Sequence, residues 1–167
     1  MADIVDLVIE DPRWEATGLA TLAPRAVEMA LRAAGIETRA LEVAILACDD
    51  AEIATLNSAF RGKSSATNVL SWPALDLFPA APGGAPSIVI PADRFGATSL
   101  GDIAIAYETV ALEAENGQIP LDHHILHLIL HASLHLLGYD HQTDPDAEAM
   151  ERLEVAALAQ AGVPSPY

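Results

Sequence analysis

The feature that most constrains this fold is the segment at residues 120–141, PLDHHILHLILHASLHLLGYDH. It contains all six histidines of the chain, and leucine or isoleucine fills most positions between them. A segment that is apolar on every side predicts a buried helix rather than an amphipathic surface helix. Because an unsatisfied polar group in a core costs about 1–3 kcal/mol, the buried imidazoles need partners.

Three of these histidines have the spacing of metal ligands. His131 and His135 are four residues apart, so on a helix they share one face and lie roughly 5–6 Å apart. Gly138 occupies the position of a glycine that ends a helix, and the turn after it would return His141 toward the first two. The H-x3-H-x5-H motif offers three nitrogen donors and leaves a fourth position for water, as in catalytic zinc sites. A cysteine-rich structural site is excluded, because Cys48 is the only cysteine.

Other residues of this segment have more than one interpretation. A single histidine in an apolar helix is usually a hydrogen-bonded core residue, whereas three at ligand spacing favour a metal site. His127 extends the four-residue spacing, but three successive turns span about 12 Å, too far for one tetrahedral ion. We interpret it as an auxiliary group or a core histidine. His123 and His124 are expected to face solvent or to cap the helix. Asp140 either orients a ligand or is a plain turn residue.

Composition limits the class of protein. The 167 residues suffice for one domain with a substantial core, and we interpret residues 1–167 as a single domain. No apolar run reaches the roughly 20 residues that span a bilayer, and the acidic start of the chain does not resemble a signal peptide. A lone cysteine fits a reducing compartment, so we expect a cytoplasmic protein without a membrane partner. The formal net charge of −16 repels nucleic acid, and no DNA binding is expected.

Hydrophobic periodicity predicts an α+β domain. Strands are expected at residues 3–10, 40–48, 67–73 and 101–106, with a further short strand at 87–90. Helices are expected at residues 18–34, 50–60, through 111 to about 115, in the histidine segment, and at 145–160. The last helix should have Asp144 as its N-cap and Pro145 at its first position. Residues 74–99 form a long Pro/Gly/Ala-rich connection that is either functional or disordered.

A second group of polar residues lies in residues 56–73, LNSAFRGKSSATNVLSWP. It contains Arg61 and Lys63, two of the eight positive residues, and Lys63 is the only lysine. Neighbouring Ser64 and Asn68 can also donate hydrogen bonds to phosphate oxygens, and Arg61 can do so through two parallel bonds. An ordinary exposed polar turn is the simpler interpretation. In so acidic a chain, the two cations indicate an anion site if they lie near the metal.

Three segments together resemble one known family. HASLHLLGYDH, residues 131–141, resembles the histidine motif of the YbeY family, metal-dependent endoribonucleases also described as rRNA maturation factors. Residues 56–73 resemble that family's arginine-containing segment, and LGDIAIAYETV, residues 100–110, resembles its strand before the active-site helix. The match spans about residues 50–145. This chain departs from the family pattern at Ala132, where glycine is usual, at Trp72, where phenylalanine is commoner, and in its longer 74–99 connection.

The resemblance implies a fold, a cofactor and a substrate. The fold would be zincin-like, a small mixed β-sheet packed against helices with a central, buried histidine-bearing helix. His131, His135 and His141 would bind Zn²⁺ or another divalent metal such as Ni²⁺, and Arg61 would be catalytic. The substrate would be single-stranded RNA, with a role in 16S rRNA 3′-end maturation and ribosome quality control.

These groups suggest a mechanism in which the metal activates water and Arg61 stabilises the charge on the phosphate. Lys63 or Asn68 would then position the RNA backbone, and no residue is an obvious general base. One alternative is a zinc peptidase, but its H-E-x-x-H motif needs glutamate where this chain has Ala132. A second alternative is a non-catalytic ribosome-assembly factor with a structural metal. The acidic charge agrees with docking through the ribosome or a basic ribosomal protein.

Overall fold

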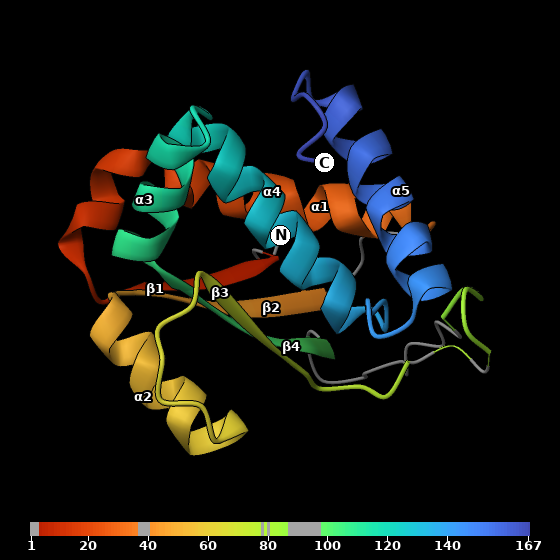
Figure 1. Cartoon of the computed structure of the whole chain (residues 1–167), viewed down its shortest axis with the longest axis horizontal. Helices are drawn as coiled ribbons and strands as arrows, with labels where there is room; N and C mark the ends of the chain where they lie inside the picture. The colour runs from red at the N-terminus through yellow and green to blue at the C-terminus, as the bar shows by residue number, and fades with distance from the viewer. Residues whose placement is uncertain (1–3, 37–40, 78, 80, 87–97) are drawn as a thin grey trace.

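A mixed β-sheet forms the centre of the computed structural model, which describes residues 4–36, 41–77, 79, 81–86 and 98–167 (Figure 1). Its strands are β1 (Val5–Ile9), β2 (Leu41–Cys48), β3 (Val69–Pro73) and β4 (Thr98–Ala106). Their order is β1-β2-β4-β3, in which β1, β2 and β4 run parallel and β3 pairs antiparallel to β4. The sheet therefore has β3 as one edge, and this edge borders the site described below.

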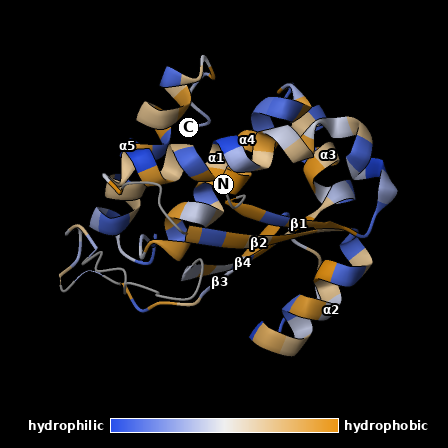
Figure 2. Cartoon of the chain, turned by 180° about the vertical axis from the view of Figure 1, so that it is seen from behind, coloured by the Kyte–Doolittle hydropathy of each residue, from blue (hydrophilic) through white to orange (hydrophobic). Residues whose placement is uncertain are grey.

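Helices cover the two faces of the sheet unequally (Figure 1). They are the 3-10 helix η1 (Pro12–Thr17), α1 (Leu19–Ala33), α2 (Asp50–Arg61), α3 (Tyr107–Asn116), α4 (Leu121–Leu136) and α5 (Asp144–Gln160). α1, α3, α4 and α5 lie on one side of the sheet, and α2 lies on the other, as the opposite view in Figure 2 also shows. The main core lies between the sheet and the larger helical layer.

Alternation of buried and partly exposed residues explains the central strand. In β2 the side chains of Val43, Ile45 and Ala47 are buried against the main core. Leu46 points to the other face and packs in a smaller cluster with Ile53 of α2. A strand with both faces in contact with apolar residues reads as a nearly continuous apolar run, which is the pattern of residues 41–48. Figure 2 shows β2 as mostly hydrophobic.

The predicted α+β class is confirmed, as is the central buried histidine helix. α4 is buried along most of its length, with Ile125, Ile129 and Leu134 fully inaccessible, and it packs mainly against α1. The other predicted helices and strands are present within a few residues of their expected ends, and Asp49 caps α2 by accepting a hydrogen bond from the backbone of Glu52. The strand expected at residues 87–90 lies outside the described residues.

Two details of the expected elements are wrong. Thr143, and not Asp144, is the N-cap of α5: its hydroxyl accepts a hydrogen bond from the Asp146 N–H, so Asp144 already belongs to the first turn. The helix η1 was not expected, although Asp11-Pro12 carries the N-cap and first-turn proline that start a helix. Among the described helices, none is long and apolar enough to cross a membrane.

Candidate metal centre

α4 and the turn after it bring His131, His135 and His141 together. The Nε2 atoms of His131 and His135 are 3.1 Å apart, and one nitrogen from each of the three rings lies within 4.8 Å of the others. The ring of His141 stacks on that of His131 with centroids 5.6 Å apart and meets His135 edge-on at 5.0 Å. Three imidazole nitrogens at this separation can converge on one ion.

A turn after α4 brings His141 back toward His131 and His135. Gly138 has a φ of +98°, and the chain turns sharply there as the N–H of Tyr139 donates to the Leu134 carbonyl. The turn passes close to Leu77, whose carbonyl oxygen would lie 2.4 Å from a Cβ added at Gly138. Beyond it, the carboxylate of Asp140 accepts a hydrogen bond of 2.7 Å from the backbone N–H of His141. Asp140 is therefore at least a turn residue that shapes the segment carrying the third histidine.

Hydrogen bonds determine which ring nitrogen of His131 and of His135 faces the metal centre. Nδ1 of His135 lies 2.8 Å from the carbonyl oxygen of Tyr139, and a carbonyl can only accept, so Nδ1 carries the proton. Nδ1 of His131 is hydrogen-bonded to the carboxylate of Glu154, which also only accepts when ionised. In both rings Nε2 is left with its lone pair, the form that binds a metal.

Burial keeps the His135 ring uncharged. It lowers the pKa of His135 to about 4, with the neighbouring His131 acting in the same direction, so His135 is neutral near pH 7. The residue Glu154 is fully buried in α5, which raises its pKa, but hydrogen bonds from His131 and Tyr167 outweigh this and leave the pKa below its ordinary value. A neutral His135 and the ionised Glu154 carboxylate behind His131 suit a site for a divalent cation.

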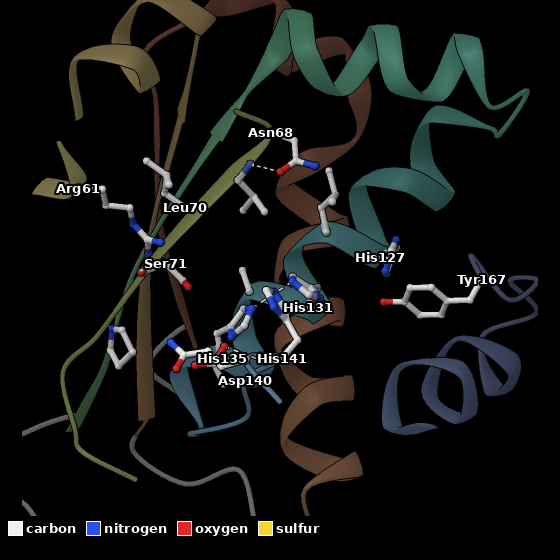
Figure 3. Close-up of a pocket in the computed structure, with 15 residues that line it drawn as sticks. Arg61, Asn68, Leu70, Ser71, His127, His131, His135, Asp140, His141 and Tyr167 are labelled. Carbon is white, nitrogen blue, oxygen red and sulfur yellow. Dashed lines mark hydrogen bonds between the residues drawn. The ribbon is translucent and has the colours of Figure 1, made fainter. Parts of the chain in front are cut away.

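The three histidines open onto a cavity of about 640 Å³. Figure 3 shows Arg61 and Ser71 on the β3 side of this cavity, with His127 and Tyr167 on the opposite side. Arg61 is the last residue of α2, and its Nη2 donates a hydrogen bond of 2.9 Å to the carbonyl oxygen of Ser71 in β3. α2 packs on the other face of the sheet, so this arginine reaches the cavity around the edge strand.

The other predicted contact residues are placed differently. Asn68 lines the cavity, but its amide donates to Glu113 at 3.0 Å and its oxygen accepts from the N–H of Val69 at 2.6 Å. Lys63 is exposed on the turn after α2 and lies outside the set of residues that line the cavity. The structure therefore brings Arg61 and Asn68 to the cavity with the histidines, but not Lys63.

The remaining histidines differ from one another. His127 lines the cavity, and burial lowers its pKa to about 4; its Nε2 is buried and makes no hydrogen bond with the described residues. His124 was expected at the solvent or as a cap, which is wrong: its side chain is 11% exposed and its Nε2 lies 3.0 Å from a carboxylate oxygen of Glu113. Glu113 also accepts from Asn68, so it links the start of α4 to the edge strand.

Glu154 and Tyr167 contribute to the site although the sequence did not indicate them. The hydroxyl of Tyr167 donates to Glu154, and its ring meets His127 edge-on with centroids 5.9 Å apart. The one available signal for Glu154 was its place in α5, three residues before the buried Ala157 and four before the buried Leu158, on the apolar face of the helix. No spacing rule connects such a residue to a motif 20 or so positions away, so only the fold reveals the contact.

Comparison with known proteins identifies similar chains. A family model described as "Endoribonuclease YbeY" matches residues 9–162. Proteins of the same name are 52% identical in Dinoroseobacter shibae, covering 98% of this chain and 90% of the relative, and 50% identical in a Jannaschia species, covering 98% and 99%. The relative from Cereibacter sphaeroides is 46% identical over the whole of both chains. These matches extend beyond residues 50–145, where the motifs lie.

A solved structure has the same fold. The solution structure of TM1509 from Thermotoga maritima superposes with a TM-score of 0.54 and covers 95% of this chain and 91% of its own. At 18% sequence identity this similarity supports the arrangement of helices and strands alone.

Proposed function

Because this chain belongs to the YbeY endoribonuclease family, we propose that it is a metal-dependent endoribonuclease that cleaves single-stranded RNA. The observation that carries this proposal is one cavity lined by His131, His135 and His141 on one side and by Arg61 on another. Nitrogen donors provide a metal position, and a guanidinium provides a phosphate position, within the same space.

The residues present fit a zinc ion as the cofactor. Two Nε2 lone pairs are oriented by hydrogen bonds on the opposite ring nitrogens, and His141 supplies the third donor. Zinc bound there would supply a Lewis acid that activates water or polarises a phosphoryl oxygen. Zn²⁺ is the proposed ion, and Ni²⁺ is the alternative that metal analysis would distinguish.

The chain's own groups then bind and orient the substrate. Arg61 holds its guanidinium at the cavity edge and would pair with the phosphate as negative charge develops on it. Asn68, the residue just before β3, would contact the RNA backbone after exchanging its hydrogen bonds to Glu113. Lys63 lies outside the cavity, so it would contact the RNA only where the RNA leaves the site.

We propose the 16S rRNA precursor as the substrate, in 3′-end maturation and ribosome quality control in the cytoplasm. The net charge of −16 opposes approach to RNA, so a basic ribosomal protein is the proposed docking partner. The zinc peptidase alternative receives no support from the site. Ala132 replaces the glutamate of the peptidase motif, and it is buried.

The experiment compares zinc content and cleavage of single-stranded RNA in the wild type, His135→Ala, Arg61→Ala and, as a matched control, Arg152→Ala, whose arginine is exposed on α5. The wild type should carry about one zinc per chain and cleave, and His135→Ala should lose both properties. Arg61→Ala should keep the zinc and lose about 100- to 1000-fold in cleavage rate.

Two results would contradict the proposal. Cleavage by Arg61→Ala at the rate of Arg152→Ala would remove the role of Arg61. Zinc-loaded wild type that leaves every single-stranded RNA intact would favour a non-catalytic ribosome-assembly factor with a structural metal.

A further inference from the structure

Glu154 is the only carboxylate among the described residues that is completely buried, with 0% exposure in α5. An ionised carboxylate removed from water is costly unless hydrogen-bond donors compensate for it. Its retention inside the protein therefore depends on the groups it contacts. Those groups belong to the proposed metal centre and to the wall of the cavity.

Three side chains surround this carboxylate (Figure 3 shows all three). Oε1 accepts a hydrogen bond from Nδ1 of His131, and Oε2 accepts one from the hydroxyl of Tyr167. Nε2 of His127 lies 3.8 Å from Oε1, beyond hydrogen-bond distance. Thus one carboxylate connects a proposed metal ligand on α4 with Tyr167, which follows α5.

The two proposed ligands on α4 are oriented by different acceptors. His135 donates from Nδ1 to the backbone carbonyl of Tyr139, which belongs to the same turn. His131 donates from Nδ1 to the charged carboxylate of Glu154, which belongs to another helix. A carboxylate in this position holds the ring, selects the tautomer and makes the opposite nitrogen a stronger donor to the metal.

We propose that Glu154 is a positioning residue: it holds His131 as the Nδ1–H tautomer with Nε2 toward the metal, and it anchors Tyr167 as a wall of the cavity. The carboxylate is not among the groups that line the cavity, so it would act through His131 and Tyr167. This proposal rests on the metal site proposed above. It adds a connection between that site and α5, so the packing of α5 contributes to metal affinity.

A second metal ion is the alternative explanation for the groups around Glu154. His127, His131 and Glu154 each offer one atom within 4.8 Å of the others. An ion there would need the Nδ1 lone pair of His131 and would displace the proton now donated to Glu154. The hydrogen-bonded arrangement keeps that proton, and it predicts one ion per chain.

The first test measures zinc affinity by competition with a chromophoric chelator, using metal-free wild type, Glu154→Gln and Glu148→Gln. Glu148 is an exposed glutamate of the same helix, so the control makes the same chemical change outside the site. Glu154→Gln should bind zinc about 10- to 100-fold more weakly than the wild type, and Glu148→Gln should match the wild type. Equal affinity in all three proteins, or two zinc ions per wild-type chain, would overturn the inference.

A second measurement needs no variant at this position. Nitrogen-15 NMR of the histidine rings in the metal-free wild type should show His131 as the Nδ1–H tautomer. The Nε2–H tautomer would overturn the inference even if Glu154→Gln proved unable to fold.

A third variant, Tyr167→Phe, separates the two contacts of Glu154. It should keep wild-type zinc affinity within a few-fold, because the hydrogen bond between Glu154 and His131 remains. A loss as large as that of Glu154→Gln would assign the effect to the phenol of Tyr167 instead.

These outcomes separate the two proposals. A wild type that binds no zinc refutes the metal site of the proposed function. A wild type that binds one zinc and cleaves RNA, together with unchanged affinity in Glu154→Gln, refutes only the role of Glu154.

Discussion

Gly138 is the residue at which one small change should disturb both the fold and the metal centre. It follows α4 with a φ of +98°, a conformation that residues with a Cβ rarely adopt. An added Cβ would lie 2.4 Å from the carbonyl oxygen of Leu77 and 2.6 Å from its carbonyl carbon. Gly138→Ala therefore combines backbone strain with a clash against main-chain atoms, which cannot rotate away as a side chain could.

The two effects have separate magnitudes. A left-handed conformation costs a non-glycine residue about 1–2 kcal/mol. Overpacking adds about 1–3 kcal/mol, so Gly138→Ala should lower the free energy of unfolding by about 2–5 kcal/mol. Gly162→Ala is the matched control: its φ is +75°, and an added Cβ would meet no atom within 4 Å. Its free energy of unfolding should fall only by the cost of the backbone strain, about 1–2 kcal/mol.

Urea denaturation of the metal-free proteins, followed by circular dichroism, measures the free energy of unfolding of both variants and of the wild type. In a chain of this size each kcal/mol corresponds to a shift of about 2–4 °C in Tm. Gly138→Ala should also bind zinc more weakly, because relief of the clash displaces the turn that carries His141. Equal losses of stability in the two variants would refute the argument from the Leu77 contact.

Two further predictions concern ionisable groups away from the metal centre. Burial raises the pKa of the Cys48 thiol to about 12, so iodoacetamide at mildly alkaline pH should modify it only after unfolding, and mass spectrometry should detect no adduct on the native protein. Hydrogen bonds from the Gly83 N–H and the Thr143 hydroxyl lower the pKa of Asp146 below the ordinary value of an aspartate. A lowered pKa contributes stability that is present above the unfolded pKa and is lost as pH falls through the folded one. Asp146→Asn should therefore flatten the decrease in Tm at acid pH, and an unchanged decrease would contradict the contact.

The part of the site that was predictable from sequence depends on local geometry. His131 and His135 share a face because of helical spacing, and Gly138 marks the end of the helix, so the approach of His141 follows from neighbouring residues. The fold brings these three rings together. Arg61 reaches the same cavity, as expected if the second polar group lay near the histidines.

The part that was not predictable depends on contacts between distant elements. Glu154 meets His131 because α5 packs on α4. Its spacing from Ala157 and Leu158 places Glu154 on the apolar face of α5, but nothing in that helix connects it with His131. The same reason explains Asn68, whose amide turned out to be bonded to Glu113 of α3. The positions of the strands were predictable from hydrophobic periodicity. Their order in the sheet, β1-β2-β4-β3, depends on how distant strands and helices pack together.

The hydrogen bond from His135 to the Tyr139 carbonyl has a consequence for how metal binding and folding are coupled. The acceptor belongs to the helix-ending turn itself, so folding of the turn orients this ring before any ion arrives. Much of the conformational entropy of assembling the ligands is then lost during folding and not during metal uptake. The domain differs in this respect from small zinc modules that are unfolded without their metal. Chelation should leave a folded, preorganised protein that takes up a divalent metal ion again without refolding.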